Sequence, residues 1–129
     1  MPAPAPERRQ VWQAMSALYL DTDIDNEVLS RVAEELARSP YPLDELQRIL
    51  RQEVHPVLVA NLYSVAPVWD GFDPRWLEEA ITAHLRRPWP MRWWRGRAMR
   101  SHAVILWHRL IRRIAAARRR LNHAHAHAH

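Results

Sequence analysis

Apolar residues recur at helical spacing along the chain, and prolines divide them into separate runs. The strongest run predicts one long helix over about residues 97–121, with an apolar stripe of Met99, Ala103, Leu106, Trp107, Leu110, Ile114, Ala117 and Leu121. The chain has only two glycines among 129 residues, which argues against a β-sandwich. We therefore predict an all-α single compact domain of five to six helices that ends in a long basic amphipathic helix.

Four or five helices are expected before this one. They are predicted over about residues 7–20, 27–38 and 43–54. Pro56 either kinks the third of these or starts a helix over 56–63, because a proline inside a helix removes a hydrogen bond. Asp73-Pro74 predicts the start of a helix that reaches about residue 85. Residues 88–90 (Pro-Trp-Pro) are expected to end it, and the next predicted helix begins near residue 97.

The predicted domain covers residues 7–121. Residues 1–6 are a Pro/Ala lead-in that we expect to be flexible, and residues 122–129 end in alternating His and Ala, typical of an affinity tail. There is no cysteine, no cofactor motif and no other recognisable ligand set, so we expect no metal site and no cofactor. The chain shows no signal peptide and no apolar run long enough to cross a bilayer, so we expect a cytoplasmic protein, with peripheral contact at the inner membrane as an alternative.

Charge divides the domain into an acidic part, residues 7–85, and a basic segment, residues 86–121. All fourteen acidic residues precede residue 80, whereas twelve of the nineteen arginines follow residue 85, and there is no lysine. The two parts are expected either to attract each other or to leave the basic segment free for an external anion.

Arginine alternates with tryptophan in the basic segment. Guanidinium groups bind phosphates in bidentate fashion, and indole rings stack on unpaired bases or lie at a membrane–water interface. The competing interpretation is that the tryptophans pack the last helix onto the domain while the arginines are solvated. The anion-binding hypothesis assigns this role to Arg86, Arg87, Arg92, Trp93, Trp94, Arg95, Arg97, Arg100, Arg112 and Arg113.

Two acidic or aromatic clusters are candidates for a protein partner. Asp21, Asp23 and Asp25 resemble the start of a calcium loop, but the later positions lack the required glycine and glutamate, so helix capping or an acidic patch for a cationic partner is favoured. Around the Asp70-Gly71 turn, Trp69 and Phe72 either close the end of the core or form an aromatic anchor. The partner-binding hypothesis therefore names Asp21, Asp23, Asp25, Trp69, Asp70 and Phe72.

Glu53 and His55 place a carboxylate near an imidazole. Residues two apart in a helix do not share a face, and nothing nearby in sequence supplies a nucleophile. An acid–base pair is therefore less favoured than a structural role at the helix break, and Asn61 is expected to serve similarly. We predict no catalytic residues.

Several segments together resemble a family of short uncharacterised bacterial proteins. They are residues 11–22, 41–46, 49–58, 61–62 and 69–72, with the order W-x-x-x-S-x-L-x-L-D-T, E-V-x-P-V-L-x-x-N-L and W-x-G-F. The resemblance covers about residues 8–80 and implies a small helical bacterial domain without a known chemistry. Its motif residues include Glu53, His55, Pro56, Asn61 and Gly71.

The function expected from the sequence is that of a small non-enzymatic interaction module, an accessory or immunity-type partner of another bacterial protein. The alternative is an anion-binding protein whose basic segment contacts nucleic acid or an anionic membrane surface. Oligomeric state is left open.

Overall fold

The computed structural model describes residues 4–20, 25–60, 72–97 and 100–127, and over these residues the fold is all-α without strands, as predicted. The helices run in the order α1 (Pro6–Ser16), the 3₁₀ turn η1 (Ala17–Tyr19), α2 (Asn26–Ala37), α3 (Leu43–Ile49), the π turn η2 (Leu50–Val54), α4 (His55–Ala60), α5 (Pro74–Leu85), α6 (Trp89–Gly96) and α7 (Arg100–His127).

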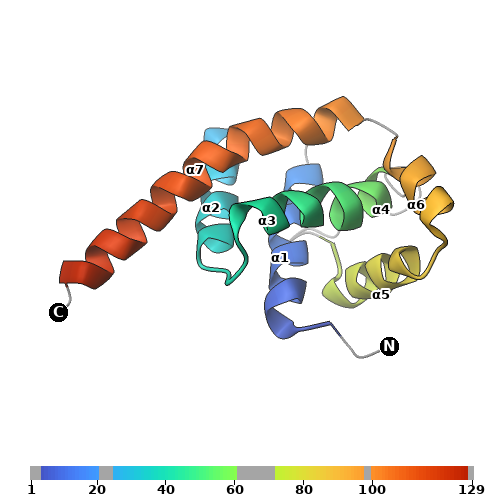
Figure 1. Ribbon diagram of the computed structural model, residues 1–129, viewed down its shortest axis with the longest axis horizontal. Coiled ribbons are helices and arrows are strands. Elements are labelled where there is room, and N and C mark those ends of the chain that lie inside the picture. The colour runs from blue at the N-terminus through green and yellow to red at the C-terminus, as the bar shows by residue number, and fades with distance from the viewer. Residues whose placement is uncertain (1–3, 21–24, 61–71, 98–99, 128–129) are drawn as a thin grey trace.

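The long helix α7 lies across the body and packs most extensively on α2 (Figure 1). Its C-terminal end projects beyond the other helices, while α5 and α6 lie at the opposite end of the molecule. The predicted apolar stripe faces inward from Ala103 to Ala117, and its residues Leu106, Leu110 and Ile114 are buried in the core together with residues of α1, α2, α3, α4 and α5. Leu121, at the end of the predicted stripe, is exposed because α7 projects there beyond the other helices, and Met99 lies outside the described residues. The final helix thus belongs to the single core.

Pro56 does not break the chain's third helical run. A proline at this position cannot donate a hydrogen bond to the preceding turn, and its ring would crowd the carbonyl of Gln52. The π turn η2 widens the helix there, and the backbone N–H of His55 bonds Leu50 five residues earlier. Helices α3 and α4 are consequently joined through η2 without a break over residues 43–60, and α4 begins at His55, one residue before Pro56.

Helix α6 was not predicted. Pro88 and Pro90 were interpreted as a stop, but proline also suits the first turn of a helix, where its missing N–H has no intrahelical partner. Pro90 occupies this place in α6, just after the helix begins at Trp89. The residues between the two predicted helices are therefore helical themselves, and their orientation shapes the candidate site.

Candidate functional site

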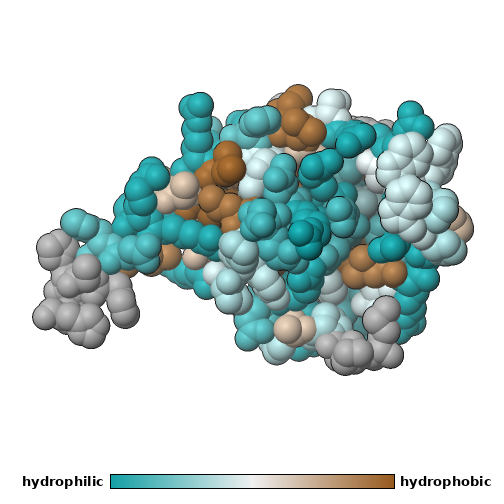
Figure 2. Space-filling model, in the orientation of Figure 1, coloured by the Kyte–Doolittle hydropathy of each residue, from teal (hydrophilic) through white to brown (hydrophobic). Residues whose placement is uncertain are grey.

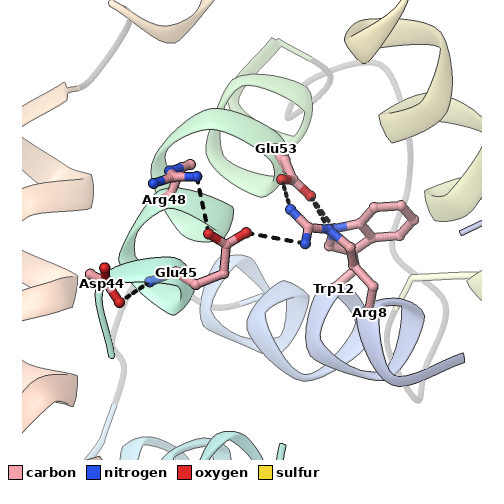
Figure 3. Close-up of polar contacts among 6 residues, drawn as sticks. All are labelled: Arg8, Trp12, Asp44, Glu45, Arg48 and Glu53. Carbon is pink, nitrogen blue, oxygen red and sulfur yellow. Dashed lines mark hydrogen bonds and ion pairs between the residues drawn. The ribbon is translucent and has the colours of Figure 1, made fainter. Parts of the chain in front are cut away.

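An ion pair between the half-buried Arg8 and the buried Glu53 fixes α1 against the π turn. Glu53 is buried and accepts hydrogen bonds from Arg8, at 3.0 Å from Arg8 Nε, and from Trp12 Nε1 at 2.8 Å (Figure 3). A second bond joins Arg8 Nη2 to Glu53 Oε2. Arg8 also reaches Glu45 at 3.2 Å, and the bond to Glu53 raises the pKa of Arg8 further above its usual range. The carboxylate of Glu53 is therefore held inside the fold.

Glu53 and His55 diverge from each other. The His55 ring is buried and shares a hydrogen bond of 2.8 Å between its Nδ1 and the Tyr19 hydroxyl. Burial raises the pKa of Tyr19, so this hydroxyl stays protonated. The two side chains of the suggested acid–base pair thus have different partners, because Glu53 bonds side chains of α1 and His55 bonds Tyr19 in the adjoining turn η1. The bonds of Glu53 go to side chains and not to the backbone groups at the helix break for which the sequence suggested it.

A second polar chain links the π turn to α5 and α6. The Gln52 carbonyl precedes Pro56 by four residues, so proline leaves it without its usual intrahelical donor. His84 Nε2 lies 3.2 Å from this carbonyl, and Arg95 Nη1 lies 3.1 Å from His84 Nδ1. Because the carbonyl only accepts and the guanidinium only donates, His84 must be neutral, with its proton on Nε2.

The surroundings of His84 favour this neutral form. Its side chain is 1% exposed, and burial followed by the nearby charge of Arg95 lowers the pKa of His84 to about 4. Burial also lowers the pKa of Arg95, with Arg87 adding to the effect. His84 therefore acts as an uncharged bridge that holds α6 against the rest of the protein.

The orientation of α6 is the reverse of that expected for a surface helix. Arg95 points toward His84 of α5, and a side-chain carbon at Gly96 would lie 3.6 Å from Pro56, so this side of the helix faces the protein. The large apolar side chains are instead exposed, at 65% for Trp89, 48% for Met91, 48% for Trp93 and 68% for Trp94. We refer to these four exposed residues together as the outer face of α6; Trp89 and Trp93 lie on the same side of the helix as Gly96, and Met91 and Trp94 lie on other sides.

A cavity of about 180 Å³ lies where α6 meets the π turn and the start of α7, and we call it the α6 cavity. It is lined by Arg51, Gln52, His55, Pro56, Trp89, Arg92, Trp93, Gly96, Arg97, Arg100 and Ala103. Four of these residues are arginines and none is acidic. Its volume is below the roughly 300 Å³ at which pockets for drug-sized ligands begin, so it suits one small anionic group.

The arginines of the α6 cavity retain bonding capacity. Arg92 Nε is buried and has no hydrogen-bond partner within the described residues. Arg97 lies over the rings of Trp93 and Trp94, at 5.0 and 5.5 Å from their centroids, which fixes the direction of its guanidinium. An oxyanion in the cavity can accept from such donors without displacing an acidic partner.

The anion-binding residues named from the sequence fall into three groups. Arg92, Trp93, Arg97 and Arg100 line the cavity. The second group lies close to the cavity without lining it. In this group, Arg95 bonds His84, whereas Trp94 on α6 and both Arg86 and Arg87 at the end of α5 are exposed. The third group lies further along α7, where Arg112 is exposed and Arg113 donates to Asn26 Oδ1 at 2.9 Å. The structure thus gathers only part of this set in one place.

The partner-binding residues are not brought together in the described part of the chain. Asp25 caps α2 by accepting a hydrogen bond of 2.8 Å from the backbone of Val28. Phe72 is buried and stacks on Trp76, so it belongs to the core and is not an exposed anchor. Asp21, Asp23, Asn61, Trp69, Asp70 and Gly71 lie outside the described residues.

Few ion pairs connect the acidic part to the basic segment among the residues that the structure describes. Within the described residues, one ion pair joins them, between Arg120 and Glu34 at 3.5 Å. Arg118 instead donates to backbone carbonyls at the end of α2 and beyond it, including Ala37 and Tyr41, where a cation stabilises the helix terminus. Most of the positive charge near α6 is left available.

Comparison with known protein families matches residues 6–122 to the family described as a domain of unknown function, DUF7079. The chain belongs to this family. The match to DUF7079 confirms the resemblance inferred from the motifs and extends it from residue 80 through α6 and most of α7, so the basic segment is part of the family's domain. Comparisons with curated proteins and with solved structures found no match.

Sequence reasoning missed three contributors to this site of the DUF7079 domain. Arg51 and Trp89 line the cavity, and His84 anchors α6. Pro56 predicts that the carbonyl four residues earlier needs a donor from outside its helix, because proline has no N–H to give it. His84 is that donor. Nothing in the sequence indicated that Arg51 would meet the basic segment.

Proposed function

We propose that this DUF7079 protein binds a phosphate-type anion in the α6 cavity. The observation that carries the proposal is the lining itself, which combines four arginines with two tryptophans and contains no carboxylate. Guanidinium groups form charge-assisted, often bidentate hydrogen bonds to phosphate oxygens. Arg92 Nε adds a buried donor that lacks a partner within the described residues.

The interaction-module hypothesis remains a prediction and is now the second candidate. Its support is a set of exposed carboxylates at and along α2, which includes Asp25, Glu34 and Glu35, although Asp25 is engaged as the N-cap and Glu34 pairs with Arg120. We also propose that the protein has a binding role and not a catalytic one. Its proposed location is the bacterial cytoplasm. The separate bonding of Glu53 and His55 supports the binding role, because Glu53 bonds Arg8 whereas His55 bonds Tyr19.

The test is calorimetric titration with inorganic pyrophosphate at low ionic strength. The double variant Arg92→Gln/Arg100→Gln removes two cavity donors, and we expect its affinity for pyrophosphate to fall by roughly tenfold or more, as charged hydrogen bonds are lost. The matched control, Arg31→Gln/Arg112→Gln, removes the same charge from exposed sites on α2 and α7 that do not line the cavity.

Retained affinity in the control would support a localised site. The proposal fails if pyrophosphate does not bind the parent protein, or if both double variants weaken binding equally, since equal loss would mean a diffuse effect of net charge. A Glu53→Gln variant that keeps the parent affinity would further support a site independent of this carboxylate, which does not line the cavity.

A further inference from the structure

The outer face of α6 places its apolar side chains in solvent, although the same helix turns arginines toward the protein. Figure 2 shows this as pale side chains of intermediate hydropathy gathered at the end of the molecule formed by α6. Within the described residues, the outer face accounts for most of the exposed large apolar side chains, and Val104 and Ile105 are exposed on α7.

We propose that this face docks on the surface of an anionic lipid bilayer, with a lipid phosphate in the α6 cavity. The inference rests on the proposed anion-binding function and names the source of the anion. Tryptophan is favoured at membrane–water interfaces because its ring is apolar while its N–H remains hydrated. Trp89 and Trp93 both line the cavity and lie on the outer face, so the apolar surface and the anion site are continuous.

Charge complementarity favours a lipid surface as the occupant. Arg86, Arg87, Arg97 and Arg100 are exposed around α6, and no acidic residue occurs after residue 80. Basic residues near an anionic leaflet each strengthen attachment, and apolar side chains add the energy of partial insertion. Over the described residues, every helix is too short or too polar to pass through a bilayer, so this attachment would be to one surface.

The aliphatic side chains distinguish a bilayer from nucleic acid. A single-stranded nucleic acid binds through stacking rings and phosphate contacts, which Trp89 and the arginines could supply. Met91, Val104 and Ile105 are also exposed, and they lack rings on which bases can stack. Insertion into the acyl boundary uses both aromatic and aliphatic groups, so an outer face that combines tryptophans with Met91 fits lipid better.

The experiment is co-sedimentation with vesicles of phosphatidylglycerol and phosphatidylcholine, compared with vesicles of phosphatidylcholine alone. We expect binding to the anionic vesicles only, and a decrease as salt is raised. The double variant Met91→Ser/Trp94→Ala removes apolar groups that do not line the cavity, and its partition into anionic vesicles should fall by roughly tenfold. Leu121→Ala, at an exposed site near the far end of α7, is the matched control and should bind as the parent does.

Pyrophosphate titration of the same variants separates this inference from the proposed function. Loss of vesicle binding in Met91→Ser/Trp94→Ala, with pyrophosphate affinity unchanged, supports docking through the outer face. If the parent protein binds pyrophosphate but not anionic vesicles, the bilayer inference is overturned and anion binding stands. The same conclusion follows if binding to a single-stranded oligonucleotide requires Trp94 whereas binding to vesicles does not. If neither vesicles nor pyrophosphate bind, both proposals fail.

Discussion

Helices α6 and α7 come from the same arginine-rich segment but turn opposite sides toward the protein. Helix α7 buries Leu106, Leu110 and Ile114 and leaves most of its arginines outside. Helix α6 attaches through Arg95 and Gly96 and leaves its tryptophans outside. The difference teaches that α7 is part of what folds the domain, whereas α6 is attached in part by polar contacts and leaves its large apolar side chains exposed.

The largest effect should come from the core contact of α7. Leu110 is fully buried, so Leu110→Ala removes apolar burial and leaves a cavity, which costs about 2–5 kcal/mol of unfolding free energy. Urea denaturation followed by circular dichroism measures this loss. A change below about 1 kcal/mol would mean that α7 does not contribute to the core as described.

A smaller loss is expected when the polar attachment of α6 is removed. Arg95→Met deletes the donor to His84 and leaves a buried ring nitrogen without a partner. We expect the unfolding free energy to fall by about 1–3 kcal/mol. The same denaturation experiment tests this, with Arg112→Met on the exposed face of α7 as control. If both variants behave alike, the bond between Arg95 and His84 does not hold α6 in place.

Acid should weaken the same attachment. The pKa of His84 falls from its usual 6.5 to about 4 in the folded protein, so the unfolded chain binds more protons between these values. The stability contributed by neutral His84 is complete above about pH 6.5 and is lost as the pH falls toward 4, by at most about 1.4 kcal/mol per pH unit.

His84→Gln should reduce this pH dependence, because an amide offers a donor and an acceptor but does not titrate. The midpoint of urea unfolding, measured from pH 7 to pH 4, tests the effect. His108→Gln, at an exposed site on α7, is the control that should keep the parent slope. An unchanged slope in His84→Gln would assign the acid sensitivity to other groups.

The contrast between α6 and α7 also explains what could be predicted from the sequence. Helix α7 was predicted because its apolar residues repeat with the period of a buried helical stripe. Helix α6 was not predicted because the prolines near residue 90 were interpreted as a helix stop. Its tryptophans are exposed, so they form no buried apolar stripe from which a helix could be predicted. The all-α fold followed from such stripes, which also predicted α1, α2, α3 and α5.

The candidate site was only partly predictable, because its residues meet through tertiary packing. Arginine interleaved with tryptophan indicated anion binding by Arg92, Trp93, Arg97 and Arg100, which do line one cavity. The contribution of Arg51 depends on how the π turn meets α6, and no local pattern near Arg51 specifies that contact. The anchor at His84 likewise depends on a carbonyl freed by a proline in another helix.

The smallest effect on stability should come from the outer face of α6, where Trp94 is 68% exposed. Trp94→Ala should change the unfolding free energy by about 0.5 kcal/mol or less, since exposed substitutions remove little burial. Trp107→Ala on α7 makes the same chemical change at a buried site and should cost about 3–5 kcal/mol. Circular dichroism is the appropriate probe, because each variant removes a fluorophore. A loss near that of Trp107→Ala would place Trp94 in the packing of the domain and remove the free apolar surface, whereas a negligible loss leaves Trp94 available for a bilayer.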